Sequence, residues 1–312
     1  MNIIDLFSQN KLIQSWHAGV SNLGRQLIMG LSGASRALAI ASAYQANEEK
    51  IVIITSTQNE VEKLASDLSS LIGEDKVYTF FADDVAAAEF IFASMDKAHS
   101  RLEALNFLQD KNQSGILITS LVGARVLLPS PKTYSESQLN FLVGDLYNLD
   151  KIVKILSNVG YQKVSQVLNP GEFSRRGDIV DIYEITADYP YRLEFFGDEV
   201  DGIRQFDAQT QKSLSNVEQV TIYPADELIL SEEDFARASQ AFEKYLETAK
   251  DDQQAYLSEL YAATQEQYRH QDIRRFLSLF YAKEWTLLDY IPKGTPVFFD
   301  DFQKLVDRIT KY

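Results

Sequence analysis

The chain has 312 residues, of which 45% are hydrophobic and 12% aromatic, and this composition is typical of a folded globular protein. It contains no cysteine, which excludes disulfides and thiolate metal sites and favours an intracellular protein. The formal net charge of −15 argues against avid nucleic-acid binding by this chain alone, because such binding needs a basic face. No apolar run reaches the length of a membrane span, so we expect a soluble, cytoplasmic protein with a protein partner.

The stretch MGLSGASRALAIAS begins like a phosphate-binding loop but lacks residues that such a loop requires. A G-x-x-x-x-G-K-[ST] loop needs glycines for close approach of the backbone to phosphate, a lysine on the outer phosphates and a hydroxyl on magnesium. Gly30 and Gly33 are present, but the last glycine, the lysine and the hydroxyl fall on Ser35, Arg36 and Ala37. The stretch therefore predicts either a disabled nucleotide loop or a helix of small residues packed on a sheet.

The rest of the first region alternates strand-like and helical patterns. Thr57 and Glu60 have the spacing of a capping box, and apolar residues at helical spacing follow them. Three short apolar runs predict buried parallel strands, at Lys50–Ser56, Val77–Phe81 and Gly115–Ser120. This alternation predicts a parallel α/β sheet.

The pattern changes after a cluster of prolines and hydroxyl residues that ends near residue 137. Leu149–Val159 has the pattern of a helix, and two strand runs follow at Asp178–Ile185 and Tyr191–Phe196. We therefore expect a small α+β domain over residues 138–223, inserted after the first unit.

From about Pro224 the chain is mainly helical, with a cap pattern at Ser231 and Asp234, and it returns to a strand near its end. There the run VFFDD places Asp300 and Asp301 after an apolar strand, where a Walker-B pair of acids lies in a nucleotide enzyme. The same acids also fit a solvated strand end or a helix cap. Together with the incomplete loop, they predict an old nucleotide fold that hydrolyses no ATP and holds no metal or cofactor.

No catalytic arrangement is found elsewhere in the sequence. The three histidines, His17, His99 and His270, are far apart and lack the spacing of metal ligands.

The run YRLEFF is more informative, because residues of a strand alternate between its two faces. Leu193 and Phe195 fall on one face, and Arg192, Glu194 and Phe196 fall on the other. If the first face is core, Phe196 either packs under a neighbouring helix or loop, or belongs to a protein-binding face. Aromatic residues and arginine are enriched at the hot spots of such faces.

Arg175 and Arg176 precede the run GDIVDIY, and they join this face if the two strands pair. The alternative is that both arginines lie in an ordinary solvated turn.

The segment NPGEFSRRGDIVDIYEITADYPYRLEFFGDEVDGIRQFDAQTQKSL (Asn169–Leu214) resembles a signature shared by UvrB and the Mfd family of bacterial transcription-repair coupling factors. GLSGASRA is similar to the loop that is an intact Walker A in UvrB and degenerate in the coupling factors. HSRLEAL (His99–Leu105) resembles a helix start found in both. The disabled loop favours the coupling factors, as does the lack of room for a tyrosine-rich hairpin between Phe80 and His99.

The resemblance implies the N-terminal UvrB-like module of a longer, ATP-dependent DNA translocase. Its domains would be a degenerate P-loop-like domain 1a at residues 1–137, domain 2 at 138–223 and domain 1b at 224–312. RNA polymerase and DNA would bind other regions of the longer protein. The alternatives are an ATP-dependent, UvrB-type loader on damaged DNA, or a module that serves only as a scaffold or autoinhibitory contact.

The resemblance also implies that domain 2 recruits UvrA in transcription-coupled nucleotide excision repair. The family residues that contact UvrA correspond here to Arg176, Arg192 and Phe196. Secondary contacts would come from three of their neighbours, Arg175, Tyr191 and Glu194.

Overall fold

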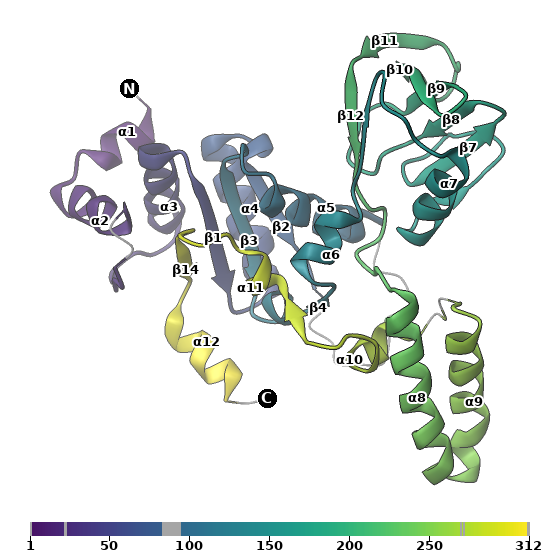
Figure 1. Cartoon of the computed structure of the whole chain (residues 1–312). Helices are drawn as coiled ribbons and strands as arrows, with labels where there is room; N and C mark the ends of the chain where they lie inside the picture. The colour runs from purple at the N-terminus through teal and green to yellow at the C-terminus, as the bar shows by residue number, and fades with distance from the viewer. Residues whose placement is uncertain (1, 22–23, 83–94, 269, 271, 311–312) are drawn as a thin grey trace. The chain divides into compact units, whose positions relative to one another are not determined.

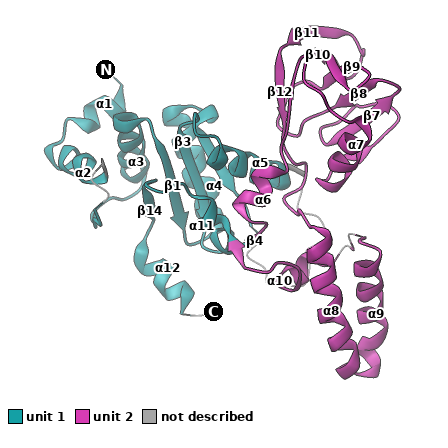
Figure 2. Cartoon of the chain, viewed as in Figure 1, with its two compact units in different colours: residues 1–126, 286–312 teal, residues 127–285 magenta. Residues whose placement is uncertain are grey.

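The chain forms two compact units, called unit 1 and unit 2 below (Figure 2). Unit 1 contains residues 1–126 and 286–312, and unit 2 contains residues 127–285. Unit 1 thus draws on both ends of the chain, whereas unit 2 is one continuous segment. The computed structural model (Figure 1) describes residues 2–21, 24–82, 95–268, 270 and 272–310.

Unit 1 is built on a parallel four-stranded sheet with the strand order β14-β1-β3-β2. In that order the strands span Val297–Phe299, Lys50–Thr55, Gly115–Ser120 and Val77–Phe80. Every residue of β3 is buried, and so are the last five residues of β1. A strand covered on both faces can be apolar at every position, which explains these runs. The predicted parallel sheet of an α/β protein is therefore confirmed.

Two helices, α3 (Ala34–Asn47) and α4 (Gln58–Ile72), pack on one face of this sheet (Figure 1). Their buried side chains form one cluster with residues of β1 and β3: Ala37, Ile40, Ala41, Tyr44, Ile51, Ile53, Val61, Leu64, Leu68, Ile116 and Ile118. The alanines of α3 leave little side chain between this helix and its neighbours, so its small residues serve close packing. The other helices of unit 1 are α1 (Ile3–Ser8), α2 (Lys11–Ser21), α5 (Met95–Gln109), α11 (Leu287–Tyr290) and α12 (Phe302–Ile309).

The start of α4 follows half of the predicted capping box. The side-chain oxygen of Thr57 accepts a hydrogen bond from the backbone N–H of Glu60. The reciprocal bond is replaced, because the Glu60 carboxylate accepts from both the backbone N–H and the hydroxyl of Ser56, at 3.1 and 2.7 Å. Both bonds to the carboxylate thus come from Ser56, the residue before the cap.

Unit 2 contains a six-stranded sheet with the order β11-β10-β9-β8-β7-β6. Neighbouring strands are antiparallel, except that β6 and β7 are parallel. Ile152 and Leu156 of α7 (Leu149–Asn158) join the core on one face of this sheet. The six strands are β6 (Gln162–Lys163), β7 (Glu172–Arg176), β8 (Ile179–Ile182), β9 (Tyr191–Phe196), β10 (Glu199–Phe206) and β11 (Ser213–Val217).

The helical part of unit 2 contains α8 (Glu232–Thr248) and α9 (Asp251–Gln265), which run side by side (Figure 1). The predicted cap is confirmed: Ser231 and Asp234 form a complete capping box at the start of α8. These helices have an apolar cluster of their own that includes Phe235, Phe242, Leu260 and Phe280. The remaining elements of this unit are β4 (Leu127–Leu128), α6 (Pro131–Glu136), β5 (Leu139–Leu142), β12 (Gln219–Ile222), α10 (Leu277–Phe280) and β13 (Trp285–Thr286).

The division into two units does not test the predicted division of the chain into three domains. The three domains expected at residues 1–137, 138–223 and 224–312 stay a prediction. The segment in which the sequence leaves no room for a tyrosine-rich hairpin lies largely outside the described residues. Within the described part of the chain, no helix combines the length and apolar character that crossing a membrane requires.

Candidate protein-binding site

The sheet of unit 2 has one face that turns away from its core, called the outer face below. Leu193 and Phe195 of β9 are 0% and 7% exposed and belong to the core. The alternation predicted for β9 is therefore confirmed, and the intervening residues lie on the opposite face. Strand register adds residues of β7 and β8 to this face, which bears Ser174, Arg176, Ile179, Asp181, Arg192, Glu194 and Phe196.

Phe196 is the most exposed aromatic residue of this face, with 82% of its surface open to solvent. It is the last residue of β9, directly before the turn formed by Gly197 and Asp198. Gly197 has φ +65°, a conformation that glycine adopts without a clash of a Cβ atom. The alternative in which Phe196 packs under a neighbouring helix or loop is wrong, because nothing in the described chain covers the ring to that extent.

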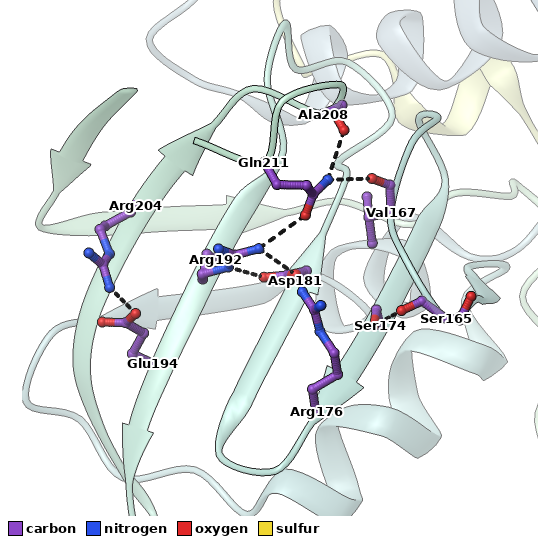
Figure 3. Close-up of polar contacts among 10 residues, drawn as sticks. All are labelled: Ser165, Val167, Ser174, Arg176, Asp181, Arg192, Glu194, Arg204, Ala208 and Gln211. Atoms are coloured by element: carbon purple, nitrogen blue, oxygen red, sulfur yellow. Dashed lines mark hydrogen bonds and ion pairs between the residues drawn. The ribbon is translucent and has the colours of Figure 1, made fainter. Parts of the chain in front are cut away.

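The two arginines of the outer face share one buried carboxylate, that of Asp181 in β8, which is 1% exposed (Figure 3). Arg192 donates two hydrogen bonds to it, from Nε to Oδ1 at 2.7 Å and from Nη2 to Oδ2 at 2.9 Å. Arg176 donates from Nη2 to Oδ2 at 2.8 Å. Asp181 therefore accepts three charge-assisted hydrogen bonds, which compensate for its removal from water.

Arg192 is held from several sides. Its side chain is 16% exposed, and its guanidinium carbon lies 4.5 Å from the centre of the Phe206 ring. The side-chain oxygen of Gln211 accepts a further bond from Nη2 at 3.3 Å (Figure 3). The hydrogen bond to Asp181 raises the pKa of Arg192 above its usual value. Arg176, in contrast, keeps 53% of its side chain exposed.

The three secondary candidates have different surroundings. Glu194 lies on the outer face and forms an ion pair with Arg204 of β10 (Figure 3). Tyr191 is partly buried and packs against the core of unit 2. Arg175 is paired in register with the buried Val180, so it lies on the core side and forms an ion pair with Asp150 of α7. Strand pairing thus brings Arg176 to the outer face but not Arg175, because adjacent residues of a strand point to opposite sides.

Sequence reasoning missed Asp181 and Gln211. A signal for Asp181 existed, because an acid between two buried apolar residues, Val180 and Ile182, faces away from the core like the arginines of the two neighbouring strands. For Gln211 no signal existed. It lies in the turn after β10 with φ +60°, and its amide donates to the carbonyl oxygens of Ala208 and Val167.

The glycine-rich stretch of unit 1 makes a turn before α3. Gly30 and Gly33 have φ +87° and +54°, and Gly33 caps the helix without a side-chain bond. The Ser35 hydroxyl closes the turn locally, accepting from the N–H of Ser32 and donating to its carbonyl oxygen. Ala37 is buried against the sheet at 1% exposure.

Arg36 forms an ion pair with Asp300, with Nη1 2.8 Å from Oδ2. Burial raises the pKa of Asp300, while the guanidinium of Arg36 opposes this shift. Asp301 has φ +54° and caps α12, and its carboxylate pairs with Lys304 at 2.8 Å. The hydrogen bond to Lys304 lowers the pKa of Asp301. Both acids thus have partners within the protein: Asp300 pairs with Arg36, and Asp301 caps the following helix and pairs with Lys304.

A metal site is not indicated by these residues. Among the residues that the structure describes, no group of three or more His, Asp or Glu side chains is arranged to hold a metal ion.

Comparison with known proteins connects the outer face to a known domain. Residues 139–228 match the family of the UvrB interaction domain. The transcription-repair-coupling factor of Bacillus subtilis (strain 168) is 31% identical over 303 residues, which are 94% of this chain and 25% of that protein. The transcription-repair-coupling factor of Staphylococcus aureus (strain bovine RF122 / ET3-1) is 29% identical over 289 residues, or 89% of this chain and 24% of that protein.

The chain is a homologue of the transcription-repair coupling factors. It spans about a quarter of the length of the curated coupling factors that it matches. The UvrB interaction domain contains the whole outer face, including Arg176, Arg192 and Phe196. The glycine-rich turn and Asp300 lie outside residues 139–228, and the similarity to the coupling factors extends over nearly the whole chain.

Proposed function

We propose that this chain acts in transcription-coupled nucleotide excision repair by docking UvrA on the outer face, with Phe196, Arg192 and Arg176 as the main contacts. The observation that carries this proposal is the 82% exposure of Phe196. Burying an exposed phenylalanine side chain lowers the free energy by about 1.5–3 kcal/mol. The isolated chain lacks this stabilisation at Phe196, and a partner that covers the ring would provide it. The match to a UvrB interaction domain supports UvrA as this partner.

The charges of the outer face support an acidic contact on UvrA. Arg192 and Arg176 together carry two positive charges, and Asp181 neutralises one of them. One positive charge therefore remains on the group formed by Arg192, Arg176 and Asp181, in a chain whose net charge is −15. Glu194 would lie at the rim of the contact, whereas Tyr191 and Arg175, which lie on the core side of the sheet, would act only indirectly.

We further propose that unit 1 is a degenerate relative of helicase-type P-loop domains and that unit 2 carries the inserted UvrA-binding domain. The parallel sheet, the glycine turn before α3 and the acid after β14 support this ancestry. The Arg36–Asp300 ion pair argues against ATP hydrolysis here, because it occupies the acid that would serve magnesium. In this proposal RNA polymerase, DNA and ATP-driven translocation belong to other parts of a coupling factor.

The test is the affinity of the 312-residue chain for UvrA, measured by titration calorimetry. Phe196→Ala is expected to weaken binding by at least about 30-fold, since the loss of a hot-spot anchor costs about 2 kcal/mol or more. Its melting temperature should stay unchanged, because the ring contributes little to the core.

Phe299→Ala is the matched control, since Phe299 is another exposed phenylalanine, 54% open to solvent, but lies in β14 of unit 1. It should bind UvrA like the wild type. Full binding by a folded Phe196→Ala variant would refute the proposed site.

A further inference from the structure

The docking proposal gives no role to Asp181, the buried acid between the two arginines of the outer face. A carboxylate that is 1% exposed lies beneath two arginines, and its three hydrogen bonds all go to their guanidinium groups. No described cation other than Arg176 and Arg192 contacts it. A group in this position touches no partner itself.

We propose that Asp181 is the positioning residue of the outer face: its buried carboxylate fixes the two guanidinium groups in the orientation in which a partner's acidic group meets them. This inference rests on the proposed function and names the chemistry of the partner's contact, a carboxylate beside an apolar pocket for Phe196.

Several N–H donors of the two arginines are not used by Asp181. Arg192 uses Nε and Nη2 on Asp181, and Arg176 uses Nη2. In the part of the chain that the structure describes, Nη1 of Arg192 donates to no internal acceptor, and neither do Nε and Nη1 of Arg176. A fixed guanidinium with free N–H groups presents a carboxylate with donors of set direction, so less rotamer entropy is lost on binding.

The orientation of the Arg192 guanidinium is fixed by several contacts. Arg192 is bound bidentately by Asp181, touches Gln211 on its other side and lies over the Phe206 ring. Gln211 is itself fixed by two backbone carbonyls, those of Val167 and Ala208 (Figure 3). The guanidinium is therefore oriented before any partner arrives.

Charge and orientation predict opposite effects of removing the carboxylate. Asp181→Asn makes the outer face more positive by one charge, so attraction of an acidic partner alone would tighten binding and speed association. Asparagine, however, accepts through one oxygen and turns an NH₂ group toward the arginines. If orientation decides, the variant binds more weakly although its face is more positive.

The experiment measures UvrA binding by the 312-residue chain with Asp181→Asn and with Glu199→Gln. Glu199 is exposed and is paired in register with Phe196, so Glu199→Gln adds the same charge near the ring without releasing an arginine. We expect Asp181→Asn to bind about tenfold more weakly or worse, and Glu199→Gln to bind as tightly as the wild type or more tightly. Equal or tighter binding by Asp181→Asn overturns the proposal.

A second measurement requires neither UvrA nor a folded Asp181→Asn variant. The Nε–H proton of Arg192, assigned through Arg192→Lys, should exchange slowly with water and give a sharp NMR signal in the free wild-type chain, because it is bonded to Oδ1 at 2.7 Å. A fast-exchanging, averaged signal overturns the proposal even if Asp181→Asn fails to fold. If the wild type does not bind UvrA, the proposed function fails, and this signal still decides whether Asp181 fixes the arginine.

Discussion

At the scale of residues, Arg36 and Asp300 form a bond between positions far apart in the sequence. The Asp300 side chain is 8% exposed, and the backbone N–H of Asp300 donates to the carbonyl oxygen of Ile54 in β1. A carboxylate so placed needs a cation, and Arg36 at the first turn of α3 supplies it. The ion pair thus ties α3 to the end of β14 inside unit 1.

Arg36→Ala should destabilise unit 1 in a pH-dependent way. Without its cation, the pKa of Asp300 rises further above its unfolded value, since burial already raises it. A carboxyl group whose pKa is raised by folding stabilises the folded state at low pH, and this contribution is lost as the pH rises through the folded pKa. We expect a loss of about 1–3 kcal/mol at neutral pH and a smaller loss near pH ~4.5.

Denaturant titration at both pH values measures this effect. Lys304→Ala is the control, because the Lys304–Asp301 pair is solvent-exposed and should contribute under about 1 kcal/mol. An equal loss for Arg36→Ala at both pH values would contradict the role given to Asp300.

Residue orientation in β9 was predictable, but residue pairing was not. A period of two is local, so Phe196 on the face opposite to Leu193 follows from six consecutive letters. The contacts of Arg192 depend on Asp181 in another strand and Gln211 in a turn, which only the register of β8 and β9 brings together. The exposure of Phe196 was not predictable either, because a local sequence pattern does not show whether another segment of the chain packs over the ring.

At the scale of elements, α7 packs on the core side of the sheet in unit 2, opposite to the outer face. Ile152 and Leu156 of this helix are buried in the core on the side of the sheet that bears Leu193. Asn148 caps the helix, and its side-chain oxygen accepts from the N–H of Lys151. Core packing and the proposed docking thus use opposite sides of the same strands.

Leu156→Ala should therefore lower stability without changing the binding surface. Leu156 is 0% exposed, and removing such a side chain leaves a cavity that costs about 2–5 kcal/mol. Ile155→Ala on the same helix is the control, because Ile155 is 36% exposed and should cost no more than about 1 kcal/mol. Thermal unfolding measures both variants.

Binding of UvrA, measured well below the melting temperature, should be the same for both helix variants. A loss of affinity in a folded Leu156→Ala variant would mean that the outer face depends on α7 packing.

Elements with strong local signals were predicted well from the sequence. The strands β1, β2 and β3 and the caps of α4 and α8 lie where hydrophobic runs and cap residues indicate them. The second bond of the α4 cap was not predictable, because Ser56 competes for Glu60. Short pieces such as β6 and β13, two residues each, carry no periodicity and depend on tertiary contacts.

At the scale of the whole molecule, the core of the sheet in unit 2 draws on a short part of the chain. All its buried members lie between Phe141 and Ile222, and Ala225 packs against them. The N–H groups of Ala225 and Asp226 both donate to the carbonyl oxygen of Val159. Residues 138–226 thus contain the core, the outer face and these closing bonds.

A fragment of residues 138–226 should fold cooperatively on its own and bind UvrA within about threefold of the whole chain, a difference below ~0.7 kcal/mol. Circular dichroism on heating and titration calorimetry measure the two properties. A folded fragment with much weaker binding would place part of the contact outside these residues. In that case the regions outside residues 138–226 would have to contact UvrA or support its binding surface.

The parallel sheet of unit 1 has a consequence for synthesis on the ribosome. Its edge strand β14 pairs with β1, although Val297 and Val52 are separated by the whole of unit 2 in the sequence. While the chain emerges, β1 has β3 on one side and an open edge on the other until β14 is translated. Unit 2 is continuous and is complete earlier, so the nascent chain finishes the unit that bears the outer face before β14 can join the parallel sheet of unit 1.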